Sequence, residues 1–494
     1  MAPLRMRPSG RTAALACALA AGRARALKNP RADLGDALGL LQTEVREQRS
    51  ELPPATPAGQ IGEHRSANRQ VMVNIGDIEY VSYLHVGGQT IAGILDTGSF
   101  ELVVFSTECK TCGTAAKYNP KLSKTHKPGA LMTVQSYGSG DTYSWEAKDT
   151  VSIGPFDAKN QTFWEVTDAR MPILRNAAFQ AIIGIGPPET PAADAWTEVQ
   201  KSLESVNKFY GDSKRPPKDA LKDVKDAIES ALEMSDTPPM LHTFGVQAFS
   251  ICMGARAGSD GYFTWQERQH TDKPDLFTRV PILGKHTWSV GLASVKLTRP
   301  GLFTETRLGC FEEGGCSALI DSGTSLLAVP RPVINKVQDL VAKMHVGCQD
   351  LSSLPNLVFE MGGKLFSLPP DAYVAEVEGK VPEHLQSFVR LRSLETNATE
   401  GPQCNVLLME SYMDSKQGPV WILGMPFFRK YYTTFAVGDS HDSRALYIAE
   451  ANDDCRPSEG ASLARTRPQK RVIDVSKVIL PPLMKKKTSG PVDL

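Results

Sequence analysis

The strongest constraint on the fold is a pattern that occurs twice in the chain. Residues 93–105 read GILDTGSFELVVF and residues 317–329 read SALIDSGTSLLAV, so each copy places an Asp after two apolar residues and before a hydroxyl residue and a Gly. Later in each half, two apolar residues and a Gly follow, at 182–184 and at 422–424. The same order of elements, repeated over about two hundred residues, predicts two related β-rich lobes.

The two Asp residues are the candidates for catalysis. A carboxylate directly behind apolar residues is costly to bury unless it is hydrogen-bonded or paired. Two carboxylates that face each other repel, so their pKa values separate and the pair holds one proton. The ionised carboxylate can accept a proton from water while its protonated partner donates to a carbonyl oxygen. We therefore predict that Asp96 and Asp321 form a catalytic pair.

The residues that follow each Asp suit the same chemistry. Gly98 and Gly323 have no Cβ, so two backbones can approach closely. Short hydroxyl side chains beside them can brace the two facing loops or hydrogen-bond the outer carboxylate oxygens. We assign the brace to Thr97 and Ser322 and the contacts with the carboxylates to Ser99 and Thr324.

Taken together, these segments resemble the pepsin-like aspartic proteases, over roughly residues 70–454. The resemblance implies a mostly β, bilobal fold with two β-barrel-like lobes and an active site in the cleft between them. It implies an endopeptidase that works in acid, is made as a zymogen, acts as a monomer on protein or peptide substrates and uses no cofactor or metal. YGSG resembles the family's flap, with Tyr137 over the substrate, followed by Gly138, Ser139 and Gly140.

Two positions depart from the family pattern. Val103 stands where many relatives have a Trp that helps to position the flap tyrosine, and Met425 stands where an Asp is frequent. Substrate specificity is therefore not carried over from the family.

Nine cysteines are present, and Cys17 lies in the apolar N-terminal stretch, which leaves an even set of eight. An even set in a secreted chain suggests disulfides. The CxxC pair at 109–112 can also form half of a zinc site or a redox pair, but no second CxxC or His pair accompanies it, so we favour a disulfide. The resemblance implies the pairs Cys109–Cys112, Cys310–Cys316 and Cys348–Cys404 and leaves Cys252 and Cys455 over.

The N-terminus predicts entry into the secretory pathway, with an extracellular, endolysosomal or vacuolar destination. Arginines precede a short apolar stretch with a small-x-small site, so we interpret residues 1–20 as a signal peptide and 21–68 as a propeptide. An organellar transit peptide and a flexible N-terminal arm are the alternatives. The sequons at Asn160 and Asn397 are candidate glycosylation sites.

The remaining boundaries follow from changes in residue pattern. We predict an N-terminal lobe over 69–250 and a C-terminal lobe over 251–454. Apolar residues at helical spacing predict a helical insertion at about 187–242, which covers the surface rather than binding a calmodulin-like partner. Residues 455–494 are basic and poor in apolar residues, so we predict a flexible tail, with binding to a charged surface as the weaker alternative.

Composition argues against several other functions. Formal net charge is zero, so no chain-wide charge favours nucleic acid, and after the N-terminus no stretch reaches the roughly 20 apolar residues of a membrane span. Two alternatives to the enzyme remain open: a non-catalytic peptide-binding protein on the same fold, and a β-rich interaction protein in which the Asp loops are ordinary turns.

Overall fold

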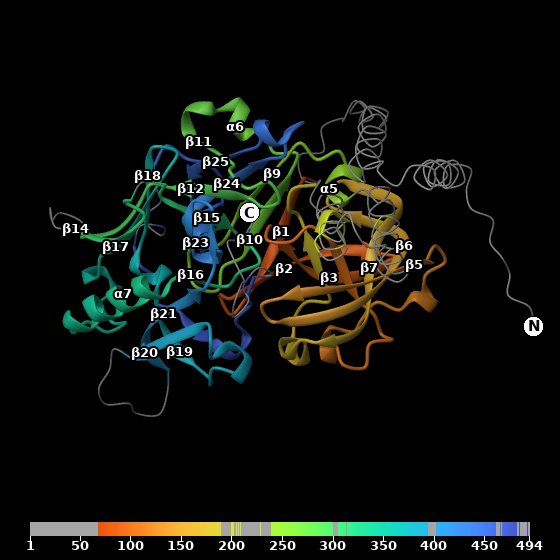
Figure 1. The fold of residues 1–494 in the computed structure, drawn as a ribbon, viewed down its shortest axis with the longest axis horizontal. Coiled ribbons are helices and arrows are strands. Elements are labelled where there is room, and N and C mark those ends of the chain that lie inside the picture. The colour runs from red at the N-terminus through yellow and green to blue at the C-terminus, as the bar shows by residue number, and fades with distance from the viewer. Residues whose placement is uncertain are drawn as a thin grey trace, which may run out of the picture. The chain divides into compact units, whose positions relative to one another are not determined.

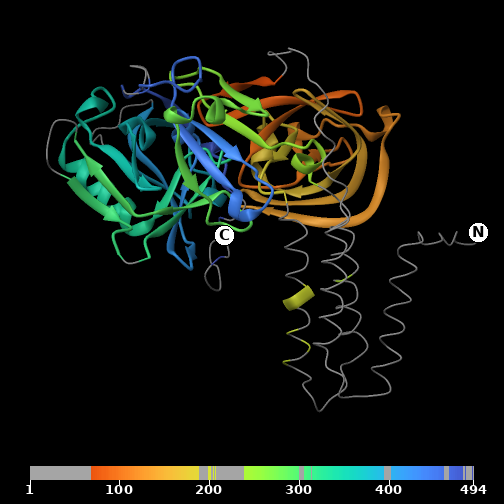
Figure 2. The same cartoon turned by 90° about the horizontal axis from the view of Figure 1, so that it is seen from above.

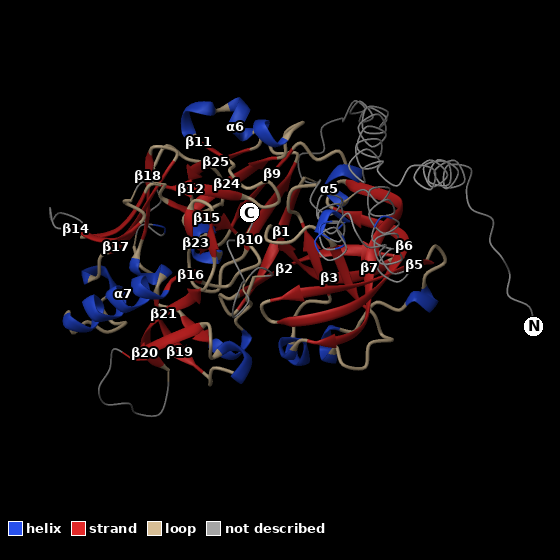
Figure 3. Ribbon diagram, in the orientation of Figure 1, coloured by secondary structure: helices blue, strands red, loops and turns tan. Residues whose placement is uncertain are grey.

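The computed structural model describes residues 68–188, 239–299, 305–312, 314–393, 402–460 and 467–481, with isolated positions between and after these ranges. Apart from Asn68, the predicted signal peptide and propeptide lie outside the described residues. So does most of the predicted insertion at 187–242, of which a few positions such as 199–201 and 204 are helical. The predicted mostly β architecture is confirmed: strands dominate the described chain (Figure 3).

A sheet of 13 strands contains the described strands of the N-terminal half, β1 to β8, and continues into strands from the C-terminal half (Figure 1). Its order is β11-β25-β24-β9-β10-β1-β2-β3-β8-β4-β7-β6-β5. The lobe boundary predicted at 250/251 lies within β9 of this sheet. The strands are β1 (Arg69–Ile75), β2 (Glu79–Val86), β3 (Gln89–Asp96), β4 (Leu102–Phe105), β5 (Lys127–Tyr137), β6 (Gly140–Ile153), β7 (Phe156–Arg170), β8 (Ala181–Gly184), β9 (Ala248–Cys252), β10 (Gly261–Trp265), β11 (Thr278–Pro281), β24 (Tyr431–Ala436) and β25 (Ala445–Glu450).

Two further sheets build the C-terminal half, on the opposite side of the molecule from the orange and yellow N-terminal strands in Figure 2. The nine-stranded sheet contains β12 (Ser289–Leu292), β15 (Cys316–Ile320), β16 (Leu327–Pro330), β19 (Val374–Glu378), β20 (Val389–Ser393), β21 (Gln403–Ser411), β22 (Asp414–Ser415), β23 (Gly418–Leu423) and β26 (Val472–Asp474). The four-stranded sheet contains β13 (Ser294–Thr298), β14 (Glu305–Gly309), β17 (Asn356–Met361) and β18 (Lys364–Leu368).

The helices that lie entirely within the described ranges are short, with one exception. Helix α7 (Arg331–Lys343) begins with a Pro in its first turn and buries Val333, Ile334, Val337 and Val341, which share one face at helical spacing. The other α-helices that lie entirely within the described ranges are α5 (Met240–Thr243), α6 (Gln269–Asp272) and α8 (Met425–Phe428). No helix among the described residues is both long enough and apolar enough to cross a membrane.

The two halves repeat one strand arrangement around the Asp motifs. In the first half, β8 pairs parallel with β3 and antiparallel with β4. In the second half, β23 pairs parallel with β15 and antiparallel with β16. In each set of three strands, the central strand contains the two apolar residues of the apolar–apolar–Gly segment identified in the sequence. The other two strands come before and after the Asp motif, so both ends of its loop lie beside the central strand. The internal repeat thus places both motifs at equivalent turns.

Four disulfides are present. Three are the pairs that the resemblance implies, Cys109–Cys112, Cys310–Cys316 and Cys348–Cys404. The fourth joins Cys252 to Cys455, the two cysteines that the sequence left over. It connects β9 to the chain just after β25, across 203 residues of sequence.

The tail predicted over 455–494 requires a correction, because its described residues pack against the rest of the chain. Arg471 is 2% exposed and forms an ion pair with Asp371. Strand β26 extends the nine-stranded sheet beside β19 in parallel register. Val475 and Val478 are fully buried in an apolar cluster of the C-terminal half. The described residues of this segment are therefore held in place by paired charges and apolar contacts, although the composition of the segment predicted a solvated chain.

Candidate active site

Asp96 and Asp321 each lie where a buried strand ends. Asp96 is the last residue of β3, and its carbonyl oxygen accepts a 2.9 Å hydrogen bond from the N–H of Ile185. Asp321 follows β15 directly, and its N–H donates to the carbonyl oxygen of Leu423 at 3.0 Å. The apolar residues before each Asp are buried, so they anchor the loops and fix the direction in which each carboxylate points.

The two carboxylates have matching hydrogen bonds. The N–H of Gly98 donates to Asp96 Oδ1 at 2.9 Å, and Ser99 Oγ donates to Asp96 Oδ2 at 2.5 Å. The N–H of Gly323 donates to Asp321 Oδ1 at 2.8 Å, and Thr324 Oγ1 donates to Asp321 Oδ2 at 2.5 Å. Each loop thus supplies one backbone and one hydroxyl donor to its own carboxylate.

Thr97 and Ser322 brace the loops against each other. The N–H of Thr97 donates to Ser322 Oγ at 3.1 Å, and the N–H of Ser322 donates to Thr97 Oγ1 at 2.9 Å. Each hydroxyl also donates across the interface, Thr97 Oγ1 to the carbonyl oxygen of Ile320 at 2.8 Å and Ser322 Oγ to that of Leu95 at 2.6 Å. These four reciprocal hydrogen bonds are buried and bring together two segments 225 residues apart in sequence.

The two glycines are required by the close approach of the loops. A Cβ on Gly98 would lie 2.7 Å from Asp321 Oδ2, and a Cβ on Gly323 would lie 2.2 Å from Asp96 Oδ1. Real Cβ contacts are not that short, so any larger residue at either position would push one carboxylate away from the other. The spacing of the pair therefore depends on both glycines.

Burial raises the pKa of both carboxyl groups. Asp96 is 4% exposed and Asp321 is fully buried, and loss of hydration disfavours the charged form of each. The charge on Asp96 raises the pKa of Asp321 further, because a second negative charge is unfavourable beside the first. The result is a pair that retains one proton at a pH where exposed carboxyls are ionised.

Residues 137–140 form the tip of the hairpin β5–β6, as the flap prediction requires. Tyr137 pairs with Gly140 across the hairpin, and Ser139 lines a cavity together with Tyr137 and Asp96. Burial, followed by the negative charges of Glu101 and Asp96, raises the pKa of the Tyr137 phenol well above its usual value. The phenol therefore stays neutral and keeps its proton as a hydrogen-bond donor.

The two departures from the family pattern are both buried. Val103 lies opposite Trp164 in the parallel pairing of β4 with β7. Both belong to the apolar cluster against which Tyr137 packs. Met425 starts α8, and its N–H donates to the carbonyl oxygen of Thr324 at 2.9 Å.

Sequence reasoning gave no role to Ser325 and Trp288. Ser325, the last residue of DSGTS, donates its hydroxyl proton to the carbonyl oxygen of Ile78 at 2.6 Å and so joins the second motif to the first lobe. Trp288 is fully buried, and its Nε1 donates to the carbonyl oxygen of Ile185 at 2.9 Å. Ser325 could have been identified from the sequence because it belongs to the DSGTS motif. Nothing in the sequence around Trp288 indicated its hydrogen bond to Ile185.

The other predicted sites are a possible metal or redox site and two sequons. Cys109 and Cys112 are bonded to each other, and the described residues contain no cluster of His, Cys, Asp or Glu arranged to hold a metal. Asn160 accepts a 2.7 Å hydrogen bond from Lys127 Nζ. Asn397 lies outside the described residues, and glycosylation at both sequons stays a prediction.

Comparison with known proteins agrees with this geometry. The sequence model of the eukaryotic aspartyl protease family matches residues 79–208 and 242–446. The chain belongs to this family. The matched region contains both Asp loops and the flap, and it ends before the chain segment that follows β25.

Its relatives include a gastricsin and several pepsins. Gastricsin of Mus musculus is 25% identical over 379 residues, which cover 74% of this chain and 80% of gastricsin. Pepsin-3 of Oryctolagus cuniculus is 26% identical over 381 residues, 75% of this chain and 81% of the relative. Pepsin A of Rhinolophus ferrumequinum is 26% identical over 382 residues, with 75% and 82% covered.

Removal of the brace is expected to disturb both stability and activity. In Thr97→Val, the buried N–H of Ser322 and the carbonyl oxygen of Ile320 lose a partner. An unsatisfied buried polar group costs about 1–3 kcal/mol, so we expect the free energy of unfolding to fall by about 2 kcal/mol or more. Misplacement of the carboxylates is expected to lower peptide hydrolysis by about tenfold or more.

Urea denaturation and initial rates of peptide hydrolysis check this prediction. Thr90→Val is the matched control, because Thr90 is an exposed residue of β3. If Thr97→Val behaved like this control, the four-bond brace would not hold the site together.

Proposed function

We propose that this chain is an active aspartic endopeptidase, which hydrolyses peptide bonds in acid with a water molecule activated between Asp96 and Asp321. The observation that carries the proposal is the matched hydrogen bonding of two buried carboxylates held by reciprocal contacts of Thr97 and Ser322. Membership of the aspartyl protease family supports it. The alternative of a peptide-binding protein without turnover has no comparable support, since both motifs are intact.

The chemistry follows from the single proton of the pair. The ionised carboxylate takes a proton from water as the water oxygen bonds to the carbonyl carbon of the substrate, and the protonated carboxyl gives its proton to the carbonyl oxygen. The resulting diol then collapses, the C–N bond breaks, and the leaving nitrogen receives a proton from the pair. Each cycle returns one proton to the two carboxylates, and no covalent intermediate forms.

The neighbouring residues have distinct tasks in this scheme. Ser99 and Thr324 hold the outer carboxylate oxygens, so the inner oxygens face the water. The flap, Tyr137 to Gly140, covers the cavity beside Asp96 and excludes bulk water from the reaction. At the flap tip, the N–H of Gly138 and the hydroxyl of Ser139 can pair with an extended peptide, which fits a protein or peptide substrate.

We further propose that the enzyme is a monomeric zymogen of the secretory pathway. The apolar N-terminal stretch of residues 1–20 and the polar segment 21–68 support a signal peptide and a removable propeptide. Four disulfides favour an oxidising compartment, outside the cell or in a vesicle. The scheme requires no metal or cofactor, because the two carboxylates supply both the acid and the base.

Asp96→Asn and Asp321→Asn are each expected to lower hydrolysis of an acid-denatured protein by at least about a thousandfold, because neither variant can provide both acid and base. A statine-type inhibitor is expected to stop the activity of the native chain. Asp442→Asn is the matched control, since the side chain of Asp442 is 98% exposed. Activity that persisted in either catalytic variant at the level of the control would rule out the proposed function.

The pH dependence of stability provides a separate prediction. Because burial and the charge on Asp96 raise the pKa of Asp321 in the folded chain well above that of an exposed aspartic acid, the folded chain keeps a proton that the unfolded chain releases. This contribution to stability is fully present below the unfolded pKa and is lost as the pH rises through the folded pKa. We therefore expect Tm to fall from about pH 4 to pH 7 by less in Asp321→Asn than in the native chain. Equal pH slopes in the two chains would show that Asp321 is not protonated in the folded state.

A further inference from the structure

The chain after β26 runs through the proposed active site. A turn of 3-10 helix at Val475–Lys477 follows the strand, and the next residues line the cavity beside the catalytic pair. Asp96 and Gly323 line this cavity together with Ile479, Leu480 and Pro481. The described residues from 478 to 484 are called the cleft segment below.

Main-chain hydrogen bonds join the cleft segment to both lobes. The N–H of Ile479 donates to Ser325 Oγ at 2.9 Å, and the N–H of Ser325 donates to the carbonyl oxygen of Ile479 at 3.3 Å. From the flap, Ser139 Oγ accepts a bond from the N–H of Leu480 at 3.1 Å, and the N–H of Gly138 donates to the carbonyl oxygen of Pro481 at 3.0 Å. Pairing of this kind is how an extended peptide binds to a protein through its backbone.

The side chains of the cleft segment alternate between the two lobes. Val478 and Leu480 belong to the apolar cluster that contains Ile422 of the C-terminal half, and they are at most 1% exposed. Ile479, between them, packs against the cluster that contains Ile94 of the N-terminal half. Alternation with a period of two is the property of an extended strand, so the segment lies in the cleft as a stretched apolar peptide.

The flap is closed tightly over this peptide. A Cβ on Gly138 would lie 2.6 Å from Leu480 Cβ and 2.8 Å from the carbonyl oxygen of Pro481. A glycine at the flap tip thus permits a contact that no other residue would allow without movement. The chain itself thus borders the space that a substrate needs beside Asp96.

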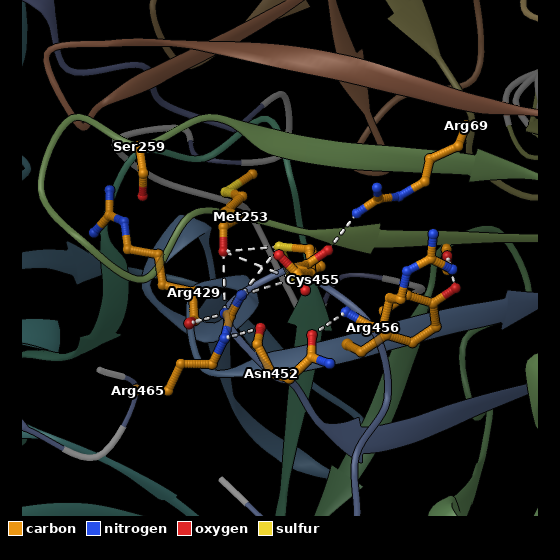
Figure 4. The surroundings of a disulfide bond; sticks show 12 residues. Arg69, Met253, Ser259, Arg429, Asn452, Cys455, Arg456 and Arg465 are labelled. Carbon is orange, nitrogen blue, oxygen red and sulfur yellow. Dashed lines mark hydrogen bonds between the residues drawn. A yellow bond between two sulfur atoms is a disulfide. The ribbon is translucent and has the colours of Figure 1, made fainter. Parts of the chain in front are cut away.

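Buried arginines fix the chain before it enters the cleft. Arg465 is 2% exposed and lies beside the disulfide of Cys455 (Figure 4). Its Nε donates to the carbonyl oxygen of Asn452 at 2.8 Å, and a terminal nitrogen donates to the carbonyl oxygen of Met253 at 3.1 Å. Arg471 is paired with Asp371, and its Nε lies 3.7 Å from Asp77 Oδ1. Separating the partners of a buried ion pair is strongly destabilising. Arg471 therefore anchors the chain just before the cleft segment.

The sequence explains why such a peptide remains in place rather than reacting. Two consecutive prolines, Pro481 and Pro482, follow Leu480. Proline has no N–H and a fixed φ, so the segment cannot form all the main-chain contacts of an ordinary extended substrate at this point. The family match ends at residue 446, so this segment lies outside the matched region.

We propose that the cleft segment is an inhibitory segment, which occupies the active site as a substrate-like apolar peptide and keeps substrate out until it is displaced or removed. The proposal rests on the proposed function for its effect on catalysis, but the binding of the segment does not. A tethered peptide acts at an effective concentration of about millimolar, so release of the segment is expected to raise activity by at least about tenfold.

Full-length variants test the proposal. Leu480→Glu and Met484→Glu each place a charge at a site that is 1% exposed, which should expel the segment, whereas Val472→Glu makes the same change in β26 at a site that is 41% exposed. After identical acid treatment, we expect the first two chains to cleave a peptide substrate at least about tenfold faster than the native chain, and Val472→Glu to match the native chain. A synthetic peptide with the sequence of residues 478–484 should restore inhibition competitively in Leu480→Glu.

Equal rates in all four chains, or no competition by the peptide, would overturn the proposal. If no chain cleaves the substrate, the proposed function fails and the binding of a fluorescent copy of the same peptide decides the inference. Binding to Leu480→Glu and Met484→Glu but not to the native chain would support an occupied cleft. Equal binding to all chains would show that the segment does not occupy it.

Discussion

The reciprocal hydrogen bonds between Thr97 and Ser322 are the contacts on which the rest of the site depends. They are buried, they join the two halves of the chain, and they fix the loops that carry the carboxylates. Because each hydroxyl both accepts and donates, neither loop can shift without leaving a backbone group unsatisfied. The brace therefore holds two acidic groups together although burial and mutual repulsion raise the pKa of both.

Much of this site could be predicted from the sequence, because its residues lie in two short, repeated motifs. The glycines and the hydroxyl donors all lie within a few positions of Asp96 and Asp321, and the apolar–apolar–Gly segments that pair with the strands before them are repeated in both halves. The same holds for three disulfides that the family resemblance implies. Local sequence was informative because the contacts that matter are local or are repeated in both halves.

The C-terminal segment was predicted wrongly for a physical reason. Arg471 resembles any solvated basic residue in the sequence, and its partners Asp77 and Asp371 lie 100 or more positions earlier. The short apolar run around Leu480 is too brief to indicate a strand, and it is surrounded by lysines and prolines. Its burial comes from a groove that two lobes form together, which no pattern within the segment can reveal. The pairing of Cys252 with Cys455 was open for the same reason.

Flap, carboxylates and C-terminal segment then form one closed assembly. Gly138 and Ser139 bind the segment from one side, Ser325 binds it from the other, and Asp96 lies beside it. The flap groups that are proposed to bind a substrate are thus already hydrogen-bonded to the cleft segment. This arrangement couples access to the catalytic pair with the position of a segment that lies outside the matched family region.

The number of protons on the catalytic pair is the quantity that tests the central claim most directly. Neutron diffraction from deuterated crystals grown in mild acid can locate them at the oxygens of Asp96 and Asp321. The account predicts one deuteron on the two carboxylates together, because burial and repulsion prevent both from being charged while the hydrogen bonds from Gly98 and Gly323 stabilise a single negative charge. Two deuterons, or none, would contradict it.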